Sequence, residues 1–165
     1  MESIRDRVAV VGMGCTKFGE HWDKSGYDLV VDEDYEAFAD AGITPKDVQA
    51  AWVGTTFSGV TGQSLAEALQ LDYIPITRVE NACATGSDAL RNAVYAVASG
   101  VVDIALALGF EKLKDTGFSG LPTSWVQATT MVHPQSTAPA NFAMLAPRYF
   151  HKYGLGAEEG KRLLA

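Results

Sequence analysis

The chain has 165 residues and a formal net charge of −7 at pH 7, with 47% hydrophobic and 20% charged residues. This length suits one globular core, and the acidic balance argues against a surface that binds nucleic acid or anionic membranes. No apolar run approaches the roughly 20 residues of a membrane span, and the N-terminus lacks a secretory signal pattern. Two cysteines, Cys15 and Cys83, cannot form a disulfide framework and lack zinc-site spacing, so we expect a cytoplasmic protein without a bound metal.

The first element is a short apolar run at residues 8–11, which ends at Gly12. A continuous run of this kind predicts a buried strand of a mostly parallel sheet. Gly12 and Gly14 share the first spacing of a dinucleotide-binding fingerprint. Lys17 stands where the third glycine is required and no helix opens there, so the sequence disfavours nucleotide binding.

Residues 27–41 have helical periodicity, and Gly42 follows as a stop signal. The apolar side consists of Leu29, Val30, Tyr35, Phe38 and Ala39. Acidic residues occupy the remainder: Asp28, Asp32, Glu33, Asp34, Glu36 and Asp40. They lack the ordered spacing of a calcium-binding loop, so we interpret them as a solvated helix face.

Five further segments continue the alternation of helix and strand. They are a helical turn at 44–47, a strand at 50–54, a helix at 64–71, a strand at 74–80 and a strand at 102–109. Ser64 is the predicted N-cap of its helix, with Glu67 in the reciprocal position of a capping box. Strands that alternate with helices over short connections predict a layered α/β domain around a central sheet.

A cysteine occupies the corner between the strand at 74–80 and the next helix. Apolar residues at helical spacing continue from residue 88 to Gly100, which places Cys83 near the first backbone N–H groups of that helix. Such groups favour a thiolate, by about 0.3–1 kcal/mol when the site is exposed. Full activation would need a second group such as a histidine. The alternative is an inert cysteine that packs as a small hydrophobe.

Residues 115–140 break the periodicity and are rich in glycine, proline, serine and threonine. A segment this long without periodicity predicts a functional covering loop, and we interpret His133 within it as structural or solvent-facing. A helix interrupted by Pro147 follows at 141–153, and another begins at 157. We expect an α/β core at 1–114 and a loop-and-helix region at 115–165 that is interrupted before the protein is complete.

Three stretches resemble the thiolase superfamily, in particular the sterol-carrier-protein-type thiolases, or lipid-transfer, acetyl-CoA acetyltransferase-like proteins. They are residues 8–19 (VAVVGMGCTKFG), 81–90 (NACATGSDAL) and 105–113 (ALALGFEKL). The resemblance implies the first of two similar layered α/β/α halves with a central mixed sheet and a long covering loop region. It matches Cys83 to the nucleophile that carries an acyl group as a thioester.

The resemblance also implies an acyl-CoA C-acyltransferase whose substrate is a coenzyme A thioester, with no other cofactor. It implies a homodimer or higher oligomer formed through the strand at 76–80, and an OB-fold partner protein. A retro-aldolase acting on an acyl-CoA side chain and a non-catalytic acyl-CoA-binding subunit are alternatives. Candidate cations for the anionic substrate are Lys112, Lys114, Arg148 and Lys152.

The sequence departs from the family in one respect that bears on catalysis. The family's activating histidine and its second acid/base residue lie in the second half, and His21, His133 and His151 match neither motif. We therefore expect this chain alone to be a poor catalyst, completed by further residues or by another chain.

Overall fold

The structure, a computed structural model, describes residues 3–116 and 138–164. The chain divides into two compact units, Met1–Gly117 and Phe118–Ala165, and each is described by itself. His133 and most of the predicted covering loop lie outside the described residues, so the covering role stays a prediction. Among the helices of the described ranges, none is long and apolar enough to cross a membrane.

The first unit is built on a three-stranded parallel sheet in the order β2-β1-β3. The strands are β1 (Ala50–Gly54), β2 (Ile76–Val79) and β3 (Ala105–Gly109). The prediction for β1 is confirmed, whereas β2 and β3 are shorter than predicted. Gly54 pairs in register with Val79 on one side and Gly109 on the other, so all three strands end at the same level. Residues that follow them are therefore brought to one edge of the sheet.

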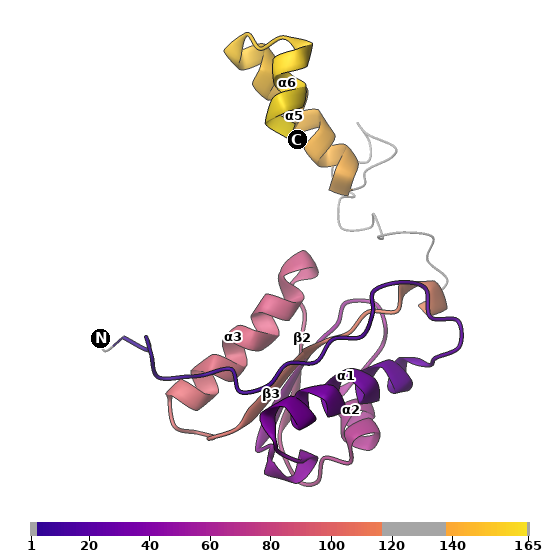
Figure 1. The fold of residues 1–165 in the computed structure, drawn as a ribbon, viewed down its shortest axis with the longest axis vertical. Helices are drawn as coiled ribbons and strands as arrows, with labels where there is room; N and C mark the ends of the chain where they lie inside the picture. Colours follow the sequence, from indigo (N-terminus) through magenta and orange to yellow (C-terminus); the bar gives the residue numbers. More distant parts are fainter. Residues whose placement is uncertain (1–2, 117–137, 165) are drawn as a thin grey trace. The chain divides into compact units, whose positions relative to one another are not determined.

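Helices cover both faces of this sheet (Figure 1). α1 (Gly26–Ala41) and α2 (Gly62–Leu69) lie on one face, and α3 (Thr85–Ala98) lies on the other. A continuous core fills the unit: Leu29, Val30, Phe38, Val48, Ala51, Val53, Leu65, Leu69, Leu71, Leu106, Leu108 and Phe110. The layered α/β prediction is confirmed. The three described strands pair in parallel, so the predicted mixed sheet, which would need an antiparallel strand, stays a prediction.

The helix starts follow capping chemistry. Ser25 caps α1 through a reciprocal pair with Asp28, and Gly42 ends the helix with a φ of 69°. The short 3₁₀ helix η1 (Pro45–Asp47) confirms the predicted turn. Ser64 is not the N-cap of α2 as predicted. Thr61 is, because its hydroxyl accepts the Ser64 N–H at 3.3 Å and the helix begins two residues before Ser64.

The predicted buried strand at residues 8–11 is wrong. This segment has no regular secondary structure, and Val10 keeps 68% of its surface exposed. The chain that follows it lies along α1, where Met13 N–H donates to Asp40 and Cys15 N–H donates to Glu36, both at 3.0 Å. Glycines make this approach possible, since a Cβ on Gly14 would lie 1.8 Å from the Glu33 carbonyl oxygen. The segment is thus held by a helix rather than by a sheet.

The interpretation of the acidic residues on α1 as one solvated face is also wrong for Asp34. That side chain is 2% exposed and its Oδ2 has no hydrogen-bond partner. Burial, together with the charge of Glu33, raises the pKa of Asp34 to about 8. Burial alone raises the pKa of Glu33 to about 7. Sequence spacing placed Asp34 among polar neighbours, but the helix turns it toward the core side that carries Val30 and Phe38.

Among the described residues of the second unit, 138–164, there are two helices, α5 (Ala138–Tyr153) and α6 (Ala157–Leu164). Pro147 lies inside α5, and Gly154 follows that helix with a φ of 64°. The two helices meet where Gly160 approaches Phe150 so closely that a Cβ would lie 2.7 Å from the ring. Both predicted helices of this region are confirmed.

Candidate active site

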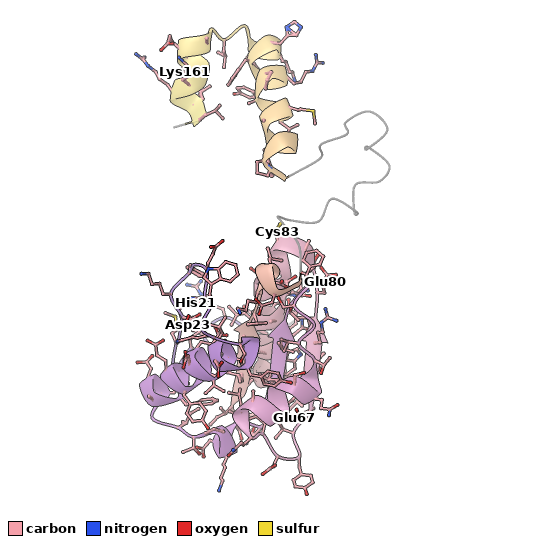
Figure 2. All side chains as sticks on the ribbon, turned by 90° about the vertical axis from the view of Figure 1, so that its right-hand side faces the viewer. His21, Asp23, Glu67, Glu80, Cys83 and Lys161 are labelled. Carbon is pink, nitrogen blue, oxygen red and sulfur yellow. The ribbon has the colours of Figure 1, made fainter. Side chains whose placement is uncertain are left out.

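Cys83 lies at the corner between β2 and α3, as the sequence predicts. It is part of the 3₁₀ turn η2 (Ala82–Ala84), which runs directly into α3, and its side chain is exposed. Figure 2 shows Cys83 at the start of α3 with Glu80 by the same corner. The thiol is therefore accessible to a ligand and close to the first turn of a 14-residue helix. The alternative of a buried cysteine that packs as a small hydrophobe is wrong.

The corner has an unusual backbone that three side-chain hydrogen bonds hold in place. Ala82 has a positive φ of 47°, a region that costs a non-glycine residue about 1 kcal/mol or more. The Thr85 hydroxyl accepts the Asn81 N–H at 2.8 Å and donates to the Ala82 carbonyl at 2.6 Å. The Glu80 carboxylate accepts the Ala82 N–H at 2.6 Å. Cys83 is thus presented by a fixed turn rather than by a loose loop.

The glycine at the end of β1 allows α3 to approach the sheet, whereas the glycine at the end of β3 has more room. A Cβ on Gly54 would lie 2.9 Å from Cγ2 of Thr85, which is shorter than any normal contact. A Cβ on Gly109 would lie 3.9 Å from the Cα of Gly86, which is ordinary contact. The N-terminus of α3, and Cys83 with it, is therefore brought over the carboxyl ends of β1 and β3, where parallel α/β sheets bind their ligands.

The carboxylate of Glu111 gathers the loop that leaves β1. Its Oε1 accepts the Thr55 hydroxyl at 2.9 Å and the N–H groups of Thr56 and Phe57, and its Oε2 accepts the Ser58 hydroxyl at 2.9 Å. Partial burial opposes ionisation of this carboxyl group. The four hydrogen bonds outweigh that effect and hold the pKa of Glu111 below its ordinary value. Glu111 is therefore an anion at neutral pH.

The histidines do not complete the site within the part of the chain that the structure describes. His21 Nε2 lies 2.5 Å from the carbonyl oxygen of Lys17, and Figure 2 shows it beside Asp23, away from Cys83. His151 lies on α5 in the second unit. No hydrogen bond between Cys83 and a histidine exists among the described residues. Whether another residue activates Cys83 therefore stays a prediction.

The candidate cations for an anionic substrate belong to both units. The Lys112 ammonium donates to the Lys24 carbonyl and to Asp115, each at 2.6 Å, and its side chain is 14% exposed. Arg148 and Lys152 are exposed on α5 of the second unit, and Lys152 lies 5.4 Å from the ring centre of Tyr153. The side chain of Lys114 lies outside the described residues. Lys112 thus has structural partners already.

Two clefts open next to the end of β3. One, of about 310 Å³, lies between α1, α2 and the loop after β1, with Tyr27, Leu65 and Phe110 in its wall. The other, of about 380 Å³, is lined by the loop at 16–22 together with Glu33 and residues 109–113. Cys83 lines neither. In the ranges 3–116 and 138–164, no group of three or more His, Cys, Asp or Glu side chains is arranged to hold a metal ion.

The sequence correctly predicted the position of Cys83 between β2 and α3, but it did not indicate the residues that hold this corner. Capping rules do not indicate Thr85, because it is the first residue of α3 rather than its N-cap, and its hydroxyl bonds backbone groups that precede the helix. Glu111 gave a small signal, as a charged residue two positions after the last residue of an apolar strand. Nothing local in the sequence pairs it with Thr55, which lies 56 residues earlier.

Comparison with known proteins identifies the fold. A family model described as the N-terminal domain of thiolase matches residues 8–137. An acetyl-CoA acetyltransferase of Methanocaldococcus jannaschii is 41% identical over 172 residues, covering 94% of this chain and 41% of that protein. Sterol carrier protein 2 of Gallus gallus is 37% identical over 169 residues, covering 94% of this chain and 31% of that protein. The chain thus spans about two fifths or less of the length of these relatives.

A solved structure shows the same arrangement of elements. The Ltp2-ChsH2(DUF35) aldolase matches with a TM-score of 0.72 at 24% sequence identity, covering 91% of this chain and 39% of that chain. At this identity the likeness concerns the fold alone. Together with the family match over residues 8–137, it leads to one conclusion: the chain belongs to the thiolase family and carries that family's N-terminal domain.

Proposed function

We propose that the protein is an acyl-CoA C-acyltransferase of the thiolase type in which Cys83 carries the acyl group. One observation carries the proposal: the exposed Cys83 stands on a hydrogen-bonded strand-to-helix corner within the segment that matches the thiolase N-terminal domain. The acetyl-CoA acetyltransferase relative, 41% identical, supports the substrate class. A cysteine that only packs as a small hydrophobe would be buried in the core, whereas Cys83 is exposed on a hydrogen-bonded turn.

The chemistry assigned to Cys83 is a thioester exchange followed by carbon–carbon bond formation. The Cys83 sulfur bonds to the acyl carbonyl carbon, the bond between that carbon and the CoA sulfur breaks, and the thiol proton passes to the departing CoA thiolate. A base outside the described residues removes the α-proton of a second acyl-CoA, and the resulting carbanion bonds to the acyl carbon. The bond between that carbon and the Cys83 sulfur breaks and the thiolate is regenerated; in degradation the same steps run in reverse. Backbone N–H groups at the start of α3 are the proposed donors to the oxyanion.

The proposal requires a base that the described residues do not supply. A cysteine thiol is fully activated as a nucleophile by an adjacent general base. The relatives are more than twice as long as this chain. We propose that the group that takes the proton from Cys83 comes from outside the described residues, so that this chain alone acylates slowly.

The same proposal includes the partners. Thr77 and Arg78 are exposed on β2, which forms one edge of the described sheet, and we propose β2 as the edge through which two copies associate. The aldolase neighbour is a complex with a DUF35 protein, and we propose that this chain works with an OB-fold partner. The two free cysteines suit a reducing compartment, and we place the protein in the cytoplasm.

Release of CoA from acetyl-CoA tests the proposal and separates it from the alternatives. We expect the 165-residue chain to release CoA slowly and stoichiometrically, Cys15→Ser to behave like the parent, and Cys83→Ser to release none. The retro-aldolase alternative, which the aldolase neighbour keeps open, needs no thioester at Cys83. An acyl-CoA-binding subunit would release no CoA. Equal release by the parent and Cys83→Ser would refute the acyltransferase proposal.

A further inference from the structure

The carboxylate of Glu111, two residues after β3, accepts four hydrogen bonds from the loop that leaves β1. We propose that Glu111 is a positioning residue for Cys83: it fixes the loop after β1, and this loop in turn fixes the end of β2 from which the cysteine corner starts. The inference rests on the proposed function, because it concerns the residue that would carry the acyl group.

The first link runs from Glu111 to the loop at residues 55–58. Four donors of this loop converge on the two carboxylate oxygens, and the Ser58 hydroxyl that donates to Oε2 also accepts the Lys112 N–H at 2.6 Å. Thr55 is fully buried, so its hydroxyl has no access to water as a substitute partner. Only a carboxylate offers acceptors on both oxygens, since a neutral amide would turn a donor toward one of the loop's donors.

The second link runs from this loop to β2. Thr55 N–H donates to the Val79 carbonyl at 3.4 Å, which extends the ladder between β1 and β2 beyond the last strand residue. The Arg78 guanidinium donates to the carbonyl oxygens of Thr55 and Thr56, each at 3.2 Å. Arg78 and Val79 come five and four residues before Cys83. Glu111 and Arg78 therefore hold the same two loop residues from opposite sides.

The third link is the corner itself. Glu80 and Asn81 directly follow β2 and supply, with Thr85, the hydrogen bonds that hold Ala82 in its left-handed conformation. A shift of the β2 end would move these residues and with them the sulfur relative to the first N–H groups of α3. Since a small misplacement of a reacting group is enough to lose rate, the loop held by Glu111 contributes to the reactivity of Cys83.

The test compares two cysteines in one molecule. Cys15 is also exposed, but its backbone N–H is bound by Glu36 of α1 and it takes no part in the Glu111 network. The rates at which iodoacetamide alkylates Cys83 and Cys15 are followed by peptide mass spectrometry in the 165-residue chain and in Glu111→Gln. Asp115→Asn is the matched control. Asp115 lies four residues after Glu111 and its carboxylate pairs with Lys112, so this variant removes one negative charge without removing an acceptor of the loop at 55–58.

We expect Glu111→Gln to slow alkylation of Cys83 about fivefold, the size of the effect that a helix N-terminus has on an exposed anion. Cys15 in the same sample, and both cysteines in Asp115→Asn, are expected to keep their rates. Glu111→Asp, which retains the carboxylate, is expected to restore at least part of the Cys83 rate. A general loss of stability would instead change both cysteines together.

The proposal is overturned if Glu111→Gln leaves the Cys83 rate unchanged or changes both cysteines in parallel. If that variant does not fold, Arg78→Met is judged by the same criteria, because it breaks the opposite side of the network and leaves Glu111 in place. Alkylation needs no acyl-CoA. A failure of this positioning role is therefore distinguishable from a failure of the acyltransferase proposal, which the release of CoA tests.

Discussion

Asp34→Asn is expected to stabilise the first unit progressively as the pH rises. The carboxyl group of Asp34 is 2% exposed, and its Oδ2 has no hydrogen-bond partner. Burial and the neighbouring Glu33 raise its pKa from 3.8 to about 8. The folded chain therefore keeps a proton that the unfolded chain releases above pH 4.

The sign and size follow from this difference. A group with a raised pKa in the folded state contributes stability that is present below its unfolded pKa and lost as the pH rises to its folded pKa. Between pH 5 and pH 8, each pH unit lowers the contribution of Asp34 to the free energy of unfolding by about 1.4 kcal/mol. Between pH 5 and pH 9 this contribution therefore falls by about 4 kcal/mol. That is a large share of the roughly 5–15 kcal/mol by which a domain is stable. Asparagine does not titrate and avoids this loss.

Urea denaturation followed by circular dichroism at pH 5, 7 and 9 measures the effect. The free energy of unfolding of Asp34→Asn, relative to the parent, is expected to rise by about 4 kcal/mol across this range. Asp72→Asn, which removes a charge at an exposed position, serves as the control and is expected to follow the parent. The reasoning is refuted if the parent is as stable at pH 9 as at pH 5 and if its free energy of unfolding changes with pH in the same way as that of Asp34→Asn.

Three further substitutions test local features. Thr85→Val, which removes the hydroxyl that bridges the cysteine corner, is expected to lower the free energy of unfolding by about 1–3 kcal/mol, while Thr85→Ser loses less; equal losses would contradict the bridging role. Gly54→Ala places a Cβ 2.9 Å from Thr85 and is expected to lower the free energy of unfolding, measured by thermal denaturation, by about 1–3 kcal/mol. Gly109→Ala, whose Cβ would lie 3.9 Å from its nearest neighbour, is expected to lower it by less. The reverse order would show that the packing of α3 does not depend on the missing side chain at Gly54. Gly14→Ala is expected to detach the N-terminal segment from α1 and to accelerate its cleavage in limited proteolysis, and unchanged cleavage would contradict the close approach to Glu33.

The parts of the fold that local chemistry specifies could be predicted from the sequence. The helix of α1 ends at Gly42 because glycine adopts the required positive φ, and β1 is bounded by loop residues on both sides. The corner at Cys83 follows from the change of periodicity between β2 and α3. In each case, residues close in sequence determine the structure.

Features that depend on distant residues could not be predicted in this way. Residues 8–11 have the composition of a buried strand, but whether they join a sheet depends on which element binds the chain that follows, here Asp40 and Glu36 of α1. The burial of Asp34 depends on which side of α1 meets the core. The network of Glu111 joins segments more than 50 residues apart, and no single stretch of sequence indicates it.

Peptide mass spectrometry of the acylated chain tests the central claim most directly. After incubation of the folded 165-residue chain with acetyl-CoA, we expect an acetyl group on the peptide that contains Cys83, removable by hydroxylamine as a thioester is. Cys15, which is also exposed but lies outside the helix corner, is expected to remain unmodified in the same digest. Acetylation of Cys83 no greater than that of Cys15, in a chain that is folded, would contradict the assignment of Cys83 as the acyl carrier.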